Sequence, residues 1–520
     1  MTQNTPSAAA RTLFLCVCAS VPAVRAAAQC PDGAPPPCAA TRAVAAAPAA
    51  NSVAVLLFEN LARDTSYAYL ADGLATEIAT SLANVPRLLV QSPGVVRRAQ
   101  RAGGDDDPRA LGRRLGVRYV VEGDFQRGGD RLRVTVRLVS VQAGTQRWSA
   151  AYTRPMADLL ALQEEIAREV ATNIAGTLLP QERTGLVARA TRDPAAWDHF
   201  MRGNFELARR NPAGVSRAIE EYEQAVRLDP RFAKAQARIG LGWCLYLDWG
   251  WRHPLPAESL LVRALAASDR ALALDSLESD AWMAKGYALA FVDPRGSAAA
   301  AQALNRAVTL DPRNVEALHQ YASLLGTVGT SYQRAIELER QALLLDPGRA
   351  ISQFTIGMTS AALGRHDDAI RGYDSALAIE PALYVGYAYR GRLRLLGGDA
   401  AGALSDAESA LRYAPAGDEY YGWTLRALLS VAGGDTAAAG DYIERIAAPW
   451  RGQATVPVLL AAQIGAGLTA LHRYDEAMEW LWRGRPLGAR LRLELDYAEY
   501  APLRSRTDFQ RLLQQIRPPS

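Results

Sequence analysis

The sequence predicts an α/β domain over residues 51–157 and an all-α solenoid over residues 190–490. Two observations carry this prediction. Up to about residue 157, short β-branched runs alternate with amphipathic stretches, which is typical of an α/β domain. After residue 190, a tripeptide ending in proline recurs at nearly constant spacing, which is typical of stacked helical repeats. With 520 residues and 49% hydrophobic content, the chain is long enough to bury a core in each part.

The repeat is clearest between Pro312 and Pro415. Successive proline steps are 347 − 312 = 35, 381 − 347 = 34 and 415 − 381 = 34 residues. A period of about 34 residues predicts one helix pair in each unit. A single pair leaves an apolar face open, so stacking of neighbouring units forms the core. We expect about eight units between residues 190 and 490, some of them degenerate, and a C-terminal cap over residues 491–520.

Small residues recur at fixed offsets before each proline. Gly357 and Ala369 would let the two helices of a unit approach closely, Tyr373 would fill the space between units, and Pro381 cannot continue the preceding helix. These positions resemble those of the tetratricopeptide repeat (TPR) family. The signature positions of the two clearest units are Gly357, Ala369, Tyr373, Ala376, Pro381, Gly391, Ala403, Ala410 and Pro415.

The TPR resemblance implies a concave binding face that is formed by the first helix of each unit. A protein or peptide is the partner that this resemblance implies. The residues expected on this face by repeat position are Glu316, His319, Phe354, Met358 and Arg392, with an ordinary solvated groove as the alternative. One long unit carries an aromatic insert, which is either a packing plug or an exposed anchor: Tyr246, Trp249 and Trp251.

Residues 51–157 alternate between predicted strands and helices. Strands are expected at 52–58, 88–92, 119–123, 131–138 and 146–152, with helices at 68–82 and 107–115. Gly128-Gly129-Asp130 is a hairpin turn signal. An apolar stripe over 158–178 predicts a connecting helix within residues 158–189.

Residues 52–82 and 115–154 resemble the TolB-like amino-terminal domain that precedes tetratricopeptide arrays, and the match covers about residues 50–180. Asp72, Gly73 and Gly123 occupy positions comparable to those in that family. Relatives often place this domain after a kinase, an adenylate cyclase or a winged-helix regulator, and the sequence shows no such head. The resemblance implies a fold more than a function.

The amino terminus has the features of a secretory signal over residues 1–28. Arg11 precedes an apolar run that is too short to span a membrane, and small residues before Gln29 offer cleavage sites. Residues 29–50, rich in Ala and Pro, are expected to be a tether. Cys30 and Cys38 are a disulfide candidate in an exported protein, with free thiols or a metal site as alternatives. A bacterial periplasmic or cell-envelope location is therefore predicted. Lipidation at Cys30 is an alternative that a poor lipobox disfavours.

No catalytic, cofactor-binding or metal-binding constellation is recognised. The five histidines lie at no metal-ligand spacing, and no Walker A, H-E-x-x-H or G-x-S-x-G motif occurs. Asp105, Asp106 and Asp107 are better explained as a solvated loop than as a cation site. With 58 Lys+Arg against 54 Asp+Glu, no basic surface predicts a nucleic-acid partner.

The sequence therefore predicts a protein–protein interaction scaffold of the cell envelope that is not an enzyme and has no transmembrane span in its mature form. Self-association is possible for such arrays. The alternative is a regulatory input module of a signalling system that partners a separate kinase or transcription factor.

Overall fold

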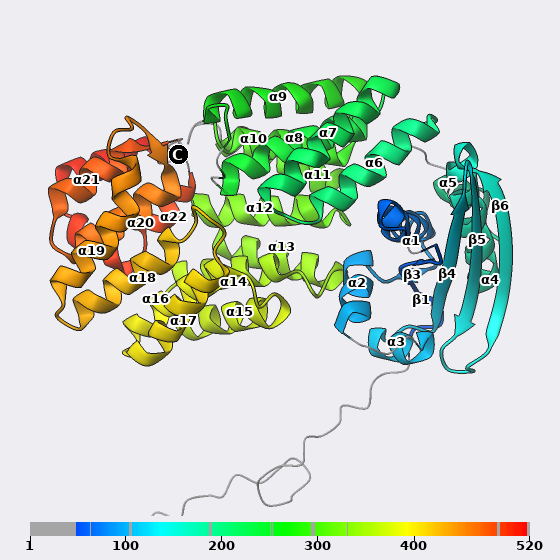
Figure 1. Ribbon diagram of the computed structural model, residues 1–520, viewed down its shortest axis with the longest axis horizontal. Coiled ribbons are helices and arrows are strands. Elements are labelled where there is room, and N and C mark those ends of the chain that lie inside the picture. The colour runs from blue at the N-terminus through cyan, green and yellow to red at the C-terminus, as the bar shows by residue number, and fades with distance from the viewer. Residues whose placement is uncertain are drawn as a thin grey trace, which may run out of the picture. The chain divides into compact units, whose positions relative to one another are not determined.

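The computed structural model describes residues 48–62, 64–102, 107–186, 190–249, 251, 253–292, 297–329, 331–485 and 489–516. The predicted signal sequence, most of the tether, Cys30 and Cys38 lie outside these residues. Within them, a small sheet with flanking helices is followed by helix pairs (Figure 1). The predicted order, a helical solenoid after a region that contains a sheet, is confirmed.

The sheet has the strand order β3-β1-β4-β5-β6, with β2 beside β4. Strand β1 runs parallel to β3 and β4, whereas β4, β5 and β6 are antiparallel neighbours. Gly129, with φ 63°, makes the turn between β4 and β5, where glycine avoids steric strain. The strand bounds are β1 (Ser52–Val55), β2 (Glu59–Asn60), β3 (Leu89–Val90), β4 (Tyr119–Gly128), β5 (Arg131–Ser140) and β6 (Gln146–Pro155).

Helices cover both faces of this sheet. Val53 and Val55 pack into one core with α1 (Ala68–Ala83) and α4 (Leu159–Ala175). Their neighbours Ala54 and Leu56 face a second core with α2 (Pro93–Ala102) and α3 (Pro108–Leu115). Alternate residues of a strand point to opposite faces, so a short apolar run fills both cores.

Three local predictions need correction. The first strand ends at Val55 rather than at residue 58. Helix α2 was not predicted, although Ser92-Pro93 is a helix start signal. The single connecting helix is two helices, because Gly176 adopts φ 77° and ends α4 before α5 (Pro180–Leu186) begins.

The described residues after 190 contain eight helix pairs, in which the two helices pack on each other and the second helix packs on the next pair. We call the two members of a pair its first and second helix. The pairs are α6 (Pro194–Leu207) with α7 (Pro212–Leu228), α8 (Ala233–Trp249) with α9 (Ala257–Leu274), α10 (Ser279–Leu289) with α11 (Ser297–Leu310), α12 (Val315–Val328) with α13 (Tyr332–Leu345), α14 (Ala350–Ala362) with α15 (His366–Ile379), α16 (Tyr384–Leu396) with α17 (Ala400–Tyr413), α18 (Tyr420–Ala432) with α19 (Thr436–Ala447), and α20 (Val458–Ala470) with α21 (Tyr474–Arg483).

Glycine sets the closeness of approach within a pair. A Cβ placed on Gly357 of α14 would lie 2.7 Å from the Tyr373 ring of α15 and 3.1 Å from the carbonyl oxygen of Ala369. Tyr373 itself is fully buried. Gly203 and Tyr222 repeat this arrangement in the first pair, where the added Cβ would lie 2.4 Å from the ring. The glycine therefore makes room for the tyrosine.

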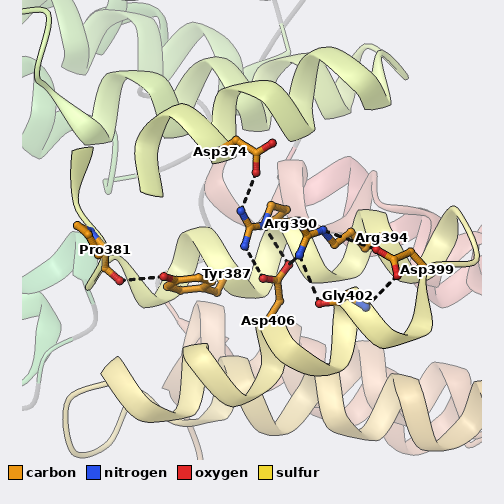
Figure 2. Close-up of polar contacts among 8 residues, drawn as sticks. All are labelled: Asp374, Pro381, Tyr387, Arg390, Arg394, Asp399, Gly402 and Asp406. Atoms are coloured by element: carbon orange, nitrogen blue, oxygen red, sulfur yellow. Dashed lines mark hydrogen bonds and ion pairs between the residues drawn. The ribbon is translucent and has the colours of Figure 1, made fainter. Parts of the chain in front are cut away.

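Salt bridges connect the fifth helix pair to the sixth and join the two helices of the sixth (Figure 2). Arg390 of α16 donates to both carboxylate oxygens of Asp406 on α17, at 3.0 and 2.5 Å, and to Asp374 on α15 at 2.6 Å. Arg394 donates to Asp406 at 3.0 Å. Asp406 is 1% exposed, so these two guanidinium groups compensate a carboxylate that would otherwise be buried alone.

The last helices do more than cap the final pair, as the predicted cap over residues 491–520 would. They are α22 (Ala489–Leu495), the 3-10 helix η5 (Ala498–Leu503) and α23 (Thr507–Gln515). Helix α22 packs on α12 and α20, and η5 packs on α20. Of these three helices, α23 is the one that packs on α21, the last helix of the eighth pair. The remaining short elements are η1 (Thr65–Tyr67), η2 (Met156–Asp158), η4 (Ala448–Trp450), β7 (Val456–Pro457) and β8 (Gly484–Arg485).

Side chains of α1 contact the first pairs of the solenoid. The Tyr69 hydroxyl donates to Asp198 of α6 at 2.5 Å, and the Arg202 guanidinium lies 4.5 Å from the centre of the Tyr69 ring. Burial raises the pKa of Glu77, also on α1, to about 7, although Lys234 and Arg238 of α8 oppose the rise. A carboxyl group with this pKa is expected to make the stability of the fold depend on pH near neutrality.

We predict that Gly357→Ala lowers stability by about 1–3 kcal/mol, because the added methyl group overlaps the Tyr373 ring. Gly440→Ala in α19 is the matched control, since its Cβ meets no heavy atom within 4 Å, and it should stabilise by about 0.5–1 kcal/mol. Thermal unfolding of both variants measures the difference. Equal effects of the two substitutions would contradict close packing at Gly357.

We predict that Glu77→Gln stabilises the protein at pH 8 more than at pH 5. The folded pKa is about 7 against an ordinary 4.5, so ionising Glu77 costs folding free energy that grows between these pH values. The gain at pH 8 should be no more than about 3 kcal/mol. Thermal unfolding across pH 4–8 measures it, with Glu408→Gln on an exposed face of α17 as control. A pH-independent difference would show that Glu77 is not buried.

Candidate functional site

First helices of successive units line a cavity of about 680 Å³, which we call the groove cavity. Three of the five residues predicted for the binding face line it: His319 on α12, and Phe354 and Met358 on α14. Their spacing follows the repeat, so repeat position placed these three residues at the cavity, and their role in binding stays a prediction. Further lining comes from α8, α16 and α18 through Trp249, Tyr384 and Tyr421.

The predicted residue Glu316 lies beside the groove cavity in an ionic cluster. Its carboxylate accepts from Arg210 at 2.7 Å and from Arg349 at 2.8 Å, and both arginines line the cavity. Burial alone would raise the pKa of Glu316, but Arg210 and Arg349 lower it well below its usual value. The carboxylate is therefore ionised and shared by two guanidinium groups.

Each of these two arginines has one unusual feature. Arg210 has φ 48°, which is uncommon for a residue other than glycine, and lies at the end of α6. Arg349 has a buried Nε without a hydrogen-bond acceptor among the described residues. A donor in this position can satisfy an acceptor on a bound partner.

Arg392 does not face an open groove, in contrast to its predicted position. Its side chain is 4% exposed and donates to Glu499 at 2.6 Å and to Glu494 at 3.4 Å. Both carboxylates belong to the segment that follows the eighth pair. Repeat spacing correctly predicted the helix of Arg392, but it carries no information about a segment about 100 residues away.

The α/β domain supplies one end of the groove cavity. Gly94, Arg97 and Arg98 of α2 line it, and Arg98 forms an ion pair with Asp346. Arg97 lies 3.2 Å from Asp72 of α1. The sequence analysis missed these residues because it did not predict α2.

A second cavity of about 400 Å³ adjoins the first, and we call it the aromatic cavity. Tyr246, Trp251, Phe291 and Trp450 are among its lining residues. The two cavities are adjacent, because they share six lining residues: Asp248, Tyr287, Gln320, Ser323, Thr327 and Leu459.

The aromatic insert packs on the core, and its rings also line the cavities. Tyr246 is a packing residue, because it is 5% exposed and its hydroxyl donates to the carbonyl of Pro212 at 2.8 Å. Trp249 and Trp251 stack with ring centroids 5.8 Å apart and are only half-buried. Each lines one of the two cavities.

Other residues considered for chemistry have structural partners. His319 is paired with the buried Glu339 at 2.8 Å, and His199 with Glu221 at 2.6 Å. Asp107 caps α3 by accepting from the Arg109 amide, whereas Asp105 and Asp106 lie outside the described residues. Burial raises the pKa of the Cys244 thiol well above its usual range. No described helix is long and apolar enough to cross a membrane.

The fold and groove define a tetratricopeptide-type solenoid that is joined to a small α/β domain. No family model matches the chain. The chain is 28% identical over 247 residues to a Rhizobium meliloti protein named "Putative adenylate cyclase 3". The matched residues make up 47% of this chain and 41% of that protein. It therefore spans less than half the length of this curated relative.

Solved structures show only weak likeness. PilF from Pseudomonas aeruginosa covers 43% of this chain and 96% of its own at 18% identity and a TM-score of 0.34. A tetratricopeptide repeat protein from Parabacteroides merdae covers 54% and 99% at 15% identity and a TM-score of 0.36. Scores at this level support no inference about function.

The curated relative corrects the prediction that this chain is not an enzyme, because that relative carries the name of one. The prediction was based on the absence of familiar catalytic motifs. Such an absence excludes only the reactions whose motifs are known, so it did not justify the conclusion.

Proposed function

We propose that this protein is a scaffold that holds a protein or peptide partner in the groove cavity. The observation that carries this proposal is the groove cavity with the aromatic cavity beside it, because the lining combines apolar side chains at Phe354, Met358 and Trp249 with arginines at 210 and 349. Specific recognition needs this combination, because apolar side chains supply affinity and charged groups fix orientation.

We further propose that residues 51–157 are a TolB-like domain and that the protein acts in the bacterial cell envelope. The sequence features of residues 1–28 support this location, and the resemblance over residues 52–82 and 115–154 supports the domain assignment. Mass spectrometry of the mature amino terminus tests it. A chain beginning near Gln29 or Cys30 is expected, and an intact Met1 in the cytoplasmic fraction would contradict it.

Site-specific photo-crosslinking tests the groove directly. A photoreactive residue at Met358 faces the groove cavity, whereas one at Leu344, which is 84% exposed, does not line it. In cells, position 358 should capture a discrete partner that position 344 does not. Capture of the same proteins from both positions, or from neither, would contradict the proposal.

We predict that Trp249→Ala weakens binding of the captured partner at least tenfold. A half-buried tryptophan at the junction of two cavities has the character of a binding hot spot. Trp423→Ala is the matched control, since Trp423 is also half-buried but stacks on Tyr442, with ring centroids 5.5 Å apart, and lines neither cavity. Titration of the purified partner measures both affinities, and equal losses would show that Trp249 acts only through stability.

A second candidate function is a regulatory module of a signalling system, which the adenylate cyclase name of the curated relative favours. In this case the groove partner would be a signalling protein. Cyclic AMP formation from ATP by the purified chain, or a changed cyclase activity in its presence, would support this candidate. A captured envelope component with no effect on cyclic AMP would favour the scaffold.

A further inference from the structure

The segment over residues 489–503, which we call the groove segment, packs against first helices of non-adjacent units. It comprises α22 and η5 and contacts α12 of the fourth pair and α20 of the eighth. Its carboxylates also reach Arg392 on α16 of the sixth pair. The segment therefore crosses the face on which a TPR-type solenoid would be expected to receive a partner.

Polar contacts of the groove segment converge on Arg392. Glu494 accepts hydrogen bonds from the Tyr389 hydroxyl, from Arg392 and from the Gln463 side chain. Glu499 accepts from Arg392 at 2.6 Å. The Tyr497 ring lies 4.6 Å from the Arg392 guanidinium carbon, within the range of a cation–π contact.

These contacts leave the polar fit incomplete. Nη2 of Arg392 is buried and has no acceptor among the described residues. Burial of three charged groups also carries a desolvation cost that ion pairing offsets only in part. The polar part of this interface therefore supplies selection for carboxylates. The hold on the segment comes from its apolar side chains, because Leu491, Leu495, Tyr500 and Leu503 are fully buried.

A departing groove segment would leave Arg392 without its carboxylates. Burial alone would lower the pKa of Arg392, whereas Glu499 and Glu494 raise it well above its ordinary value. An unpaired buried guanidinium carries a high desolvation free energy. Only an occupant that brings its own carboxylates would compensate the charge of Arg392 again.

One residue connects the groove cavity to the groove segment. Tyr389 both lines that cavity and donates to Glu494. The polar contacts of the groove segment therefore begin at a side chain in the cavity lining.

We propose that the groove segment is an internal ligand and that the partner of the groove carries an acidic peptide of the same chemistry, which takes its place. That chemistry is two carboxylates five residues apart with an aromatic ring between them, as in Glu494, Tyr497 and Glu499. The proposal deepens the scaffold function and rests on it for the identity of the competing ligand.

The test uses the full chain with a protease site in place of residues 486–488. After cleavage, a fluorescent peptide with the sequence of residues 489–520 should exchange into the protein. The same peptide with Glu494→Gln and Glu499→Gln should bind at least tenfold more weakly. Failure of the first peptide to exchange, or equal binding of both, would overturn the proposal.

Two further measurements keep the outcome decisive. If cleavage unfolds the chain, hydrogen exchange of the uncut protein replaces it: excess acidic peptide should speed exchange of residues 491–503 at least tenfold and leave α7 unchanged. No change would overturn the proposal. A partner captured at Met358 that does not compete with the peptide would refute the internal ligand and leave the scaffold standing. Peptide exchange without any captured partner would refute the scaffold and leave the internal ligand standing.

Discussion

One buried carboxylate holds together the wall of the groove. Glu316 of the fourth pair bonds to Arg210, which follows the first helix of the first pair, and to Arg349, which precedes the fifth. The three residues are 106 and 33 positions apart in sequence, so no local propensity brings them together. Their contact joins the first, fourth and fifth pairs beside the cavity, and removing either arginine would leave part of a buried charge uncompensated. The unusual backbone of Arg210 is consistent with a position that its surroundings impose.

Two other parts of the chain pair arginine with carboxylate beside the first helices of the units. Helix α2 of the α/β domain lines the groove cavity, and its Arg98 forms an ion pair with Asp346. The groove segment pairs Glu494 and Glu499 with Arg392 of α16. Arg98 is partly exposed whereas Arg392 is buried, so the second set of ion pairs is the more strongly desolvated.

The sequence predicted those parts of the structure that have a local or periodic signal. The repeat predicted helix pairs, and its offsets placed His319, Phe354 and Met358 on the cavity. Alternation predicted strands, although the first ends three residues early. The same reasoning could not find Arg210 or the cover over Arg392, because ion pairs between distant residues leave no period. Helix α2 had a signal in Ser92-Pro93 that was overlooked.

The central claim is that Glu316 ties the first pair to the fourth across the groove. A double-mutant cycle of Arg210→Met and Glu316→Gln measures it, with the opening free energies of α6 and α12 read by native-state hydrogen exchange. A direct contact predicts a coupling of about 1–3 kcal/mol, felt in both helices. Additive effects of the two substitutions would contradict the contact, and with it the wall on which the groove depends.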